Sequence, residues 1–433
     1  MIPADPHPLD VGDGPLALGL AMDEPDPDSL SAATRLRRRV SPDLAALALE
    51  QASLRRRARV KFGEQAGRHL YTATGLEQAT RPQVSAWRAQ TFGAEQHRGS
   101  GEQSGPPTRV VDLGCGLGFD ALAFAAAGHE VDAVERDPLT ASCARHNLAQ
   151  HQLAHSTPHT SEPAAARVWV GDAEQAVDTL LDGRPEALVF VDPARRSTTG
   201  RSWRLEDLSP GWDFVLGLRS RAARLVVKLG PGIARSALPD DLDRHWVSHD
   251  GSLVELCLAS VDDPYDTHSD APSDAGSGAG VDHVVALRGD RRHTLVSQGL
   301  PRPQVGPIGS YLHEPDPAVI RAQVYAELVA SLAGAEAWFV DHDVAYLTSD
   351  APLESPLLAS FAVGEVLPWS EKTVRAWCRA HDVGTLEIKK RGIDVDPAEL
   401  RRRLKLRGRA AATLVITPTP AGARAVFCRR LPA

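Results

Sequence analysis

The chain has 433 residues, of which 42% are hydrophobic and 24% are charged, and its formal net charge is −8. This length exceeds one typical domain and the apolar content suffices for real cores, so we expect two or three domains. The net charge of −8 argues against a uniformly basic nucleic-acid-binding coat, and five cysteines without a C-x-x-C pair exclude a disulfide framework and a typical zinc site.

The same composition bears on the compartment. Unpaired cysteines are typical of a reducing environment. The N-terminus lacks the apolar core of a signal peptide, and no apolar stretch is long enough to cross a bilayer. We therefore expect a cytoplasmic protein that has no membrane partner.

Two regions precede the first strong strand pattern. Residues 1–33 are rich in proline, aspartate and glycine, and we predict that they are disordered. Residues 34–105 are expected to form a helical N-terminal region and a polar linker, with helical patterns from about Arg35 to Phe92. A basic run at residues 55–61 in this region could contact phosphate groups.

The segment VVDLGCGLGFD at residues 110–120 is the most informative part of the chain. An apolar strand leads into glycines at alternate positions, and a helix-forming run follows. Such a turn opens a cofactor site at the carboxyl end of a parallel strand, because glycine lets backbone N–H groups approach a ligand. A dinucleotide fingerprint requires Gly or Ala where this chain has Phe119, so NAD is disfavoured.

Polar residues stand at the ends of the strands predicted next. Glu135 ends the strand at residues 129–135, Asp172 follows the strand at 167–171, and Asp192 follows the strand at 187–191. A further strand at residues 224–228 ends in Lys228. Short apolar runs separated by helical spacers predict an α/β fold with a doubly wound, mostly parallel sheet. Because the carboxyl ends of parallel strands lie at one edge, we expect the functional residues there.

The D-x-G-x-G-x-G loop from Asp112 to Gly118 resembles that of class I S-adenosylmethionine-dependent methyltransferases. The resemblance implies a Rossmann-like methyltransferase domain, placed at residues 106–305, and S-adenosyl-L-methionine as the cofactor. A carboxylate about 20 residues past such a loop can accept both hydroxyls of a ribose, which points to Glu135. In that family an acid at the position of Asp172 meets the adenine amino group. The predicted cofactor-binding residues are Asp112, Gly114, Cys115, Gly116, Gly118, Glu135, Asp172 and Ala173.

The predicted sheet ends in two strands at residues 252–258 and 283–287, which we expect to form an antiparallel edge pair. Between them, residues 266–280 are rich in Ser, Asp, Gly and Ala and are predicted to be a mobile insertion.

A small α+β domain is predicted at residues 306–433. One helix face carries apolar residues from Val319 to Leu332, and Ser370 can cap a later helix. The sequence Asp396-Pro397-Ala398-Glu399 is a complete helix start. Residues 381–433 hold twelve Lys and Arg against five Asp and Glu, which indicates either a polyanion-binding surface or a solvated face.

Three phrases resemble a bacterial family of class I methyltransferases with a C-terminal THUMP-like domain. They are DPARR at residues 192–196, VKLGPG at 227–232 and LEIKKRG at 386–392. Because THUMP domains proper bind RNA, the resemblance implies RNA as partner by analogy, with tRNA or rRNA the most plausible species. We expect substrate contacts from Arg196, Lys228, Lys389, Lys390 and Arg391. The segment at residues 75–80 also resembles a pre-sheet segment of guanosine-N2 methyltransferases that covers the cofactor.

The expected catalytic residues are Asp192, Pro193 and Arg195. The Asp192 carboxylate and the Pro193 carbonyl could orient an exocyclic amine, and favour the pyramidal nitrogen of its transition state. Methyltransferases of such amines carry a second proline and an aromatic residue here, where this chain has Ala194 and Arg195. The Arg195 guanidinium could stack on a base, clamp a phosphate, or only tether the loop.

The predicted function is therefore S-adenosylmethionine-dependent methylation of a base nitrogen in tRNA or rRNA by direct in-line transfer. Carbon methylation is disfavoured because uracil-C5 methyltransferases need a cysteine just after the fifth strand, and here none appears between Lys228 and Cys257. Lys228 could face the acceptor or pair with an acid. The alternatives are a small-molecule or protein acceptor, and an RNA-binding protein with a vestigial cofactor site. No metal is expected, since Pro158 interrupts the spacing of His151, His155 and His159. The oligomeric state is not predicted.

Overall fold

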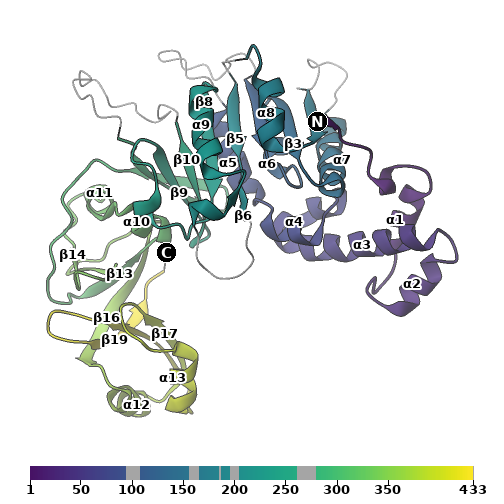
Figure 1. Cartoon of the computed structure of the whole chain (residues 1–433). Helices are drawn as coiled ribbons and strands as arrows, with labels where there is room; N and C mark the ends of the chain where they lie inside the picture. The colour runs from purple at the N-terminus through teal and green to yellow at the C-terminus, as the bar shows by residue number, and fades with distance from the viewer. Residues whose placement is uncertain (94–107, 156–164, 185–186, 196–203, 261–278, 433) are drawn as a thin grey trace. The chain divides into compact units, whose positions relative to one another are not determined.

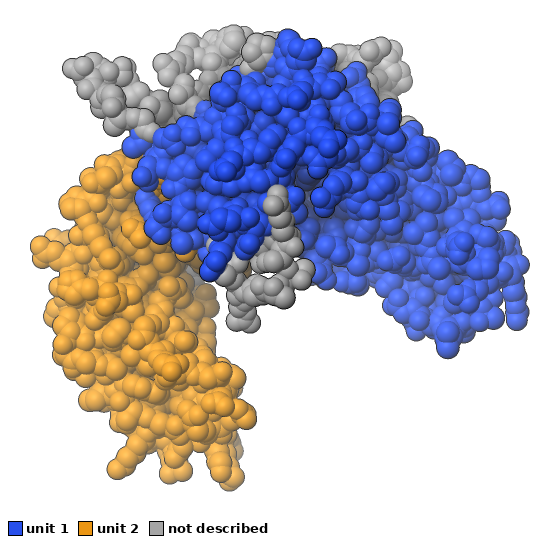
Figure 2. Space-filling model, in the orientation of Figure 1, with its two compact units in different colours: residues 1–243, 255–280 blue, residues 244–254, 281–433 orange. Residues whose placement is uncertain are grey.

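The computed structural model describes residues 1–93, 108–155, 165–184, 187–195, 204–260 and 279–432. It divides into two compact units (Figures 1 and 2). Unit 1 comprises Met1–Asp243 and Glu255–Gly280, and unit 2 comprises Arg244–Val254 and Val281–Ala433. The chain therefore changes unit three times, and the single boundary predicted at residue 305 does not separate them. Most of the predicted insertion at residues 266–280 lies outside the described residues.

Residues 1–33 are folded, contrary to the predicted disorder. The N-terminal helices are α1 (Gly14–Met22), α2 (Leu30–Leu36), α3 (Pro42–Phe62), α4 (Ala73–Gln78) and α5 (Pro82–Phe92). Ala17 and Ala21 of α1 are fully buried in a core shared with α3, because small apolar residues recur there at helical spacing. The polar residues serve as local caps, since Ser29 Oγ accepts the Ala32 N–H at the start of α2. The polar composition that led to the predicted disorder therefore supplies capping residues at the ends of helices.

The sheet of unit 1 confirms the predicted α/β class. Its strand order is β1-β4-β3-β2-β5-β8-β10, with the five central strands parallel. Strand β10 pairs antiparallel with β8, and β1 pairs antiparallel with β4. The strands are β1 (Ile2–Pro3), β2 (Arg109–Leu113), β3 (Glu130–Glu135), β4 (Ala166–Val170), β5 (Leu188–Val191), β8 (Arg224–Leu229) and β10 (Ser252–Ala259).

Helices cover both faces of this sheet (Figure 1). Right-handed crossovers place α6 (Phe119–Ala126) and α7 (Pro138–His155) on one face, and α8 (Ala173–Leu181) and α9 (Trp212–Gly217) on the other. Every residue of β5 is buried, as expected for a parallel strand covered twice. A two-stranded pair of β6 (Ala194–Arg195) and β7 (Leu208–Ser209) follows the tip of β5.

Unit 2 contains strands that the sequence assigned to the methyltransferase domain. Strand β11 (Asp282–Arg288) pairs parallel with β9 (Asp243–His249) and antiparallel with β12 (Arg291–Val296). The expected antiparallel pairing of residues 252–258 with 283–287 therefore differs from the structure, in which β11 takes β9 as its neighbour. The missed signal is β9, whose sequence DRHWVSH is too polar to be recognised as a strand.

A second sheet of unit 2 has the order β14-β15-β13-β16-β19-β18-β17. Along β18 the side chains alternate, with Leu414 and Ile416 in one core cluster and Val415 in another. Its strands are β13 (Tyr311–Pro315), β14 (Trp338–Phe339), β15 (Leu347–Ser349), β16 (Leu358–Pro368), β17 (Val383–Lys390), β18 (Ala410–Thr417) and β19 (Arg424–Arg430). Its helices are α10 (Pro317–Ala322), α11 (Tyr325–Ala330), α12 (Glu371–Ala380) and α13 (Pro397–Leu404).

The two helix N-caps predicted in unit 2 are present in the structure. Ser370 caps α12 by accepting the Thr373 N–H at 3.0 Å, and Asp396 caps α13 by accepting the Glu399 N–H at 2.8 Å. The helix predicted along residues 319–332 is instead two short helices, because Gln323 adopts a left-handed conformation with φ of 62° and ends α10.

Candidate active site

The glycine loop between β2 and α6 is tightly fixed. Gly114, Gly116 and Gly118 all have left-handed backbone angles, with φ of 86°, 55° and 77°. The N–H groups of Gly114 and Cys115 both donate to the Val134 carbonyl, at 2.9 and 3.0 Å. A Cβ added at Gly118 would lie 2.7 Å from Leu148, so only glycine allows α7 to pack this closely against the loop.

The Glu135 side chain supports this loop from the tip of β3. Its Oε2 accepts the Gly116 N–H at 3.0 Å, and its Oε1 accepts the Asp137 N–H at 2.9 Å. These two hydrogen bonds hold the carboxylate beside the loop, at the edge of the sheet where the sequence predicted it. Asp172 caps α8 through Oδ1, which accepts the Glu174 N–H at 2.9 Å. Ala173 is the first residue of that helix.

Asp112 lies beneath the loop as a buried polar group without a protein partner. Neither carboxyl oxygen accepts a hydrogen bond from the described residues. Burial, together with the negative charges of Asp120 and Asp192, raises the pKa of Asp112 well above its usual range. Buried polar atoms are normally paired, so an orphaned carboxyl at this edge favours a bound polar ligand.

Asp192 follows β5 directly and meets the loop. Its N–H donates to the Leu113 carbonyl at 3.3 Å, and a Cβ added at Gly114 would lie 3.1 Å from the Asp192 carbonyl oxygen. The Asp192 side chain is 35% exposed, so a ligand can still reach the carboxylate. Burial of the remainder raises the pKa of Asp192, although Lys228 opposes that shift.

Lys228 pairs with acids inside the site, which is one of the two alternatives that the sequence left open. Its contact with the acceptor stays a prediction. Its Nζ donates to Asp192 Oδ2 at 2.5 Å and to Thr80 Oγ1 at 2.9 Å. Asp120 Oδ2 lies 3.8 Å from the same nitrogen. Burial alone would lower the pKa of Lys228, but the Asp192 and Asp120 carboxylates raise it above its ordinary value, so the side chain stays protonated.

A buried network extends this pairing toward the N-terminal helices. Arg88 of α5 is fully buried, and its guanidinium donates to the carboxylates of Asp120 and Glu255. It also lies 4.8 Å from the centroid of the Phe190 ring. Thr80 donates to Asp120 Oδ2 at 2.7 Å. The charges of Arg88 and Lys228 lower the pKa of Asp120, despite the opposing effect of burial.

Sequence reasoning missed Arg88, Asp120 and Glu255 as parts of this site. Asp120 stands directly after the glycine loop, and that position alone could have indicated it. Arg88 and Glu255 lie 167 positions apart, so no local pattern links them.

The segment at residues 75–80 lies on the loop, because a Cβ added at Gly75 would be 2.7 Å from Leu117. This proximity places Gly75 beside the glycine loop, and the implied role of the segment in covering the cofactor stays a prediction.

The structure brings the predicted cofactor residues and Asp192 to neighbouring strand ends of one sheet. Pro193 is buried directly after Asp192. Arg195 lies in β6, but its side chain and all of Arg196 lie outside the described residues.

Lys389, Lys390 and Arg391 belong to unit 2 and differ from one another. Lys389 and Arg391 are paired with Glu314, at 2.7 and 3.2 Å, whereas Lys390 is exposed. The expected substrate contact is therefore weakened for Lys389, whose charge Glu314 and Glu387 neutralise.

The basic run at residues 55–61 mainly stabilises the fold. Arg55 is buried and donates to the His69 carbonyl at 2.9 Å. Lys61 donates to the carbonyls of Leu76, Glu77 and Ala79 at the end of α4. Burial lowers the pKa of Lys61 to about 8. The Arg55 and Lys61 side chains are thus engaged within the protein, whereas Arg56, Arg57 and Arg59 are exposed, and the predicted phosphate contact of the run stays a prediction.

Comparison with known proteins places this site in context. Two Mycobacterium tuberculosis proteins, both described as uncharacterized S-adenosylmethionine-dependent methyltransferases, are 31% identical over 401 residues, covering 88% of this chain and 94% of theirs. A crystal structure of a putative methyltransferase from Porphyromonas gingivalis W83 has the same fold, with a TM-score of 0.73 and 21% identity, covering 98% of this chain and 100% of that one.

Two family models match parts of the chain. Residues 358–430 match a THUMP domain-like family, and residues 7–58 match a domain of unknown function. Among the described residues, none of the helices has both the length and the apolar character needed to cross a bilayer.

Proposed function

The chain belongs to the family of S-adenosylmethionine-dependent methyltransferases represented by the two Mycobacterium tuberculosis relatives, and from this premise we propose that it methylates a base nitrogen of tRNA or rRNA. The cofactor is S-adenosyl-L-methionine, as in those relatives. The observation that carries the proposal is the position of Asp192, whose carboxylate is partly exposed beside the glycine loop and is held there by Lys228.

The residues at the sheet edge fit this cofactor. The left-handed glycines leave no side chain between the loop backbone and a ligand, and Glu135 stands beside them as an acceptor for ribose hydroxyls. Asp172 retains Oδ2 for an adenine amino group, since its Oδ1 caps α8.

Direct transfer requires little acid–base chemistry from the protein. When bound, S-adenosyl-L-methionine supplies a methyl group on a positively charged sulfur, which is already a good leaving group. The chain has to hold an acceptor lone pair in line, and positioning of this kind can contribute about 7–11 kcal/mol. Asp192 would accept hydrogen bonds from an amine, and the Pro193 carbonyl could accept a second one. Lys228 fixes the Asp192 carboxylate through Oδ2, which leaves Oδ1 for the acceptor.

RNA is the acceptor that the C-terminal part of the chain favours. The THUMP-like match lies in unit 2, and the arginines there are only partly committed to internal pairs. On α13, Arg401 donates to the Leu386 carbonyl and Arg403 to Glu371. Arg402 pairs with Glu399 at 3.2 Å, but its side chain is 76% exposed and stays accessible to a phosphate. Exposed cations of this kind contact phosphates, which position an RNA without specifying its sequence.

The test is transfer of tritiated methyl groups by the full-length protein to RNA from a strain that lacks the gene. We expect label in the RNA fraction, and nucleoside mass spectrometry identifies the methylated base. RNA from the parent strain, already modified, is the matched control and should accept little label.

The Asp192→Asn variant should lose turnover by about 100-fold or more while it retains cofactor affinity. The matched control is Asp178→Asn, because the Asp178 side chain is 78% exposed on α8. Label confined to a protein or small-molecule fraction would overturn the RNA assignment, and equal loss of cofactor binding would overturn the role of Asp192.

A further inference from the structure

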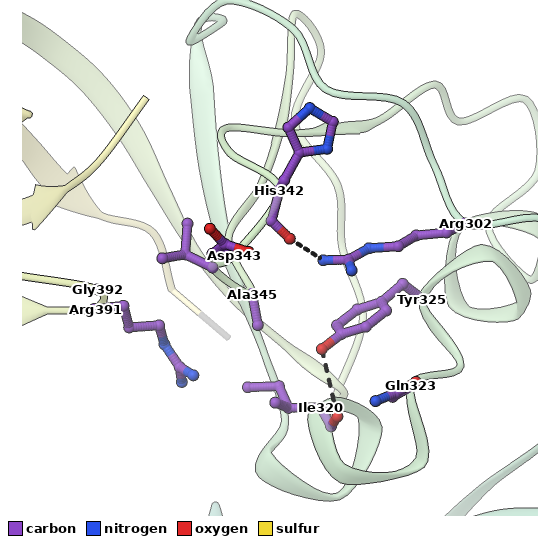
Figure 3. A pocket seen from close by; sticks show the side chains of 10 residues that line it. Arg302, Ile320, Gln323, Tyr325, His342, Asp343, Ala345, Arg391 and Gly392 are labelled. Carbon is purple, nitrogen blue, oxygen red and sulfur yellow. Dashed lines mark hydrogen bonds between the residues drawn. The ribbon is translucent and has the colours of Figure 1, made fainter. Parts of the chain in front are cut away.

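Unit 2 contains a pocket of about 540 Å³ whose lining residues all belong to that unit (Figure 3). It lies between the break after α10, the loop at residues 342–345 and the turn that follows β17. Its polar lining comes from Arg302, Gln323, Tyr325, His342, Asp343 and Arg391. A volume of this size is typical of a site for a small ligand.

Arg302 is held in place while part of its guanidinium stays available. The group lies 4.3 Å from the Phe339 ring centroid and 5.7 Å from that of Tyr325. Its Nη2 donates to the His342 carbonyl at 2.9 Å, as Figure 3 shows. Stacking fixes the plane of the guanidinium without using its other N–H groups, so these can donate to a ligand.

Arg391 approaches the pocket from the opposite side in Figure 3. Its guanidinium lies 5.4 Å from the Tyr346 ring centroid, and Nη2 donates to Glu314 Oε1 at 3.2 Å. Its Nε is buried without a hydrogen-bond partner among the described residues. Glu314 is shared with Lys389, which also lies 3.9 Å from Glu387, so Arg391 does not have this carboxylate to itself.

Arg302, Tyr325 and Arg391 line the same pocket, and the Tyr325 hydroxyl donates to the Ile320 carbonyl at 3.4 Å. Burial raises the pKa of Tyr325, and the positive charges of Arg302 and Arg391 oppose that shift. Asp343 is the one acidic residue among those that line the pocket, against the two arginines Arg302 and Arg391. The charges of these three lining residues therefore sum to a positive value.

The backbone around the pocket is specialised as well. Gln323 has φ of 62°, a conformation uncommon for residues other than glycine, and its side chain lines the pocket where α10 stops. Gly392 has φ of 65°, and a Cβ added there would lie 2.7 Å from Val344. These two positions set the pocket wall on either side.

We propose that this pocket binds one nucleotide of the RNA acceptor, with its phosphate between Arg302 and Arg391. Two guanidinium groups match the charge and the oxygen geometry of a phosphate. Gln323 and Asp343 supply a donor and acceptors for a ribose hydroxyl or a base edge, groups that inorganic phosphate lacks. The inference rests on the proposed function, because the nucleotide is taken to belong to the methylated RNA.

The test measures binding of a short fluorescein-labelled single-stranded RNA to the full-length protein by anisotropy, without the cofactor. Arg302→Gln and Arg391→Gln should each weaken binding roughly tenfold and reduce the salt dependence, as loss of a phosphate contact does. Arg379→Gln on α12 removes the same charge from an exposed position outside the pocket and should weaken binding less than either pocket variant. AMP should compete with the labelled RNA, and adenosine should not.

Two further measurements separate this proposal from its premise. Calorimetry with S-adenosyl-L-methionine should give unchanged affinity for every variant, because the cofactor residues lie in unit 1. Arg391→Lys should recover part of the RNA affinity if the charge is what binds.

Equal losses in Arg379→Gln, or failure of AMP to compete, would overturn the pocket assignment. Methylation of RNA that is insensitive to Arg302 and Arg391 would overturn it too, while the proposed function stands. RNA binding that depends on the pocket, without any methylation of RNA, would support the pocket as an RNA site and overturn the proposed function.

Discussion

Glu135 contacts the glycine loop through one oxygen and the start of α7 through the other. A carboxylate bound by two backbone N–H groups has a fixed orientation, and each oxygen keeps a lone pair for a ligand. A bound ribose would therefore meet an acceptor that needs no rearrangement. We therefore expect binding of the cofactor's ribose to depend strongly on the Glu135 carboxylate.

We expect Glu135→Gln to weaken cofactor binding by about 1–3 kcal/mol, the scale of a lost charge-assisted hydrogen bond. Calorimetric titration with S-adenosyl-L-methionine measures this directly. Glu130→Gln is the matched control, because Glu130 lies at the other end of β3 and its side chain is 53% exposed. An unchanged dissociation constant in Glu135→Gln would refute the ribose assignment.

Helix α5 is held by a buried ion-pair network. Arg88 anchors it to α6 through Asp120 and to β10 through Glu255. The same Asp120 faces Lys228, so the position of α5 and the position of Lys228 are linked through one carboxylate. A helix outside the predicted sheet thus supports the side chain that orients Asp192.

Replacing Arg88 by Met should cost about 3–5 kcal/mol of unfolding free energy, because two buried carboxylates lose their partner. Chemical denaturation compares this variant with Arg81→Met, whose side chain is exposed at the start of the same helix. Similar losses in both variants would mean that the buried pairing contributes little.

The parts of the fold that were predicted correctly depend on residues that are close together in the sequence. The glycine loop and the helix start at Asp396 each depend on neighbours within a few positions. The break at Gln323 escaped because its apolar spacing continues across it, and a left-handed glutamine has no sequence signature. Strand β9 escaped because its sequence is too polar to be recognised as a strand. The ion pair of Arg88 with Glu255 escaped because it joins residues distant in the chain, which a single sequence cannot relate.

The whole molecule contains buried histidines that set how it responds to acid. Burial lowers the pKa of His7, His69 and His313 to about 4. In the unfolded chain these groups take up protons near their ordinary value of 6.5, whereas the folded chain stays unprotonated down to about 4. The unfolded state then binds more protons in that window, so stability is present above pH 6.5 and is lost as pH falls toward 4.

His313 offers the cleanest measurement, since it is fully buried between Ser349 and Ser360, whose hydroxyls lie 2.8 Å from its ring nitrogens. His313→Asn should be destabilised at pH 7, and its deficit against the wild type should shrink by up to about 3 kcal/mol toward pH 4. Urea denaturation across this range tests it, with the partly exposed His293→Asn as control. A deficit that stays constant with pH would contradict the burial effect.

Arg88 and its partner Glu255 are separated by 167 positions, and this spacing has a consequence for synthesis. On the ribosome, the helix that carries the arginine emerges long before the strand that carries the glutamate. Until that strand is translated, the guanidinium lacks one of its two carboxylate partners in this network. The buried pairing can therefore be completed only after residue 255 has been synthesised.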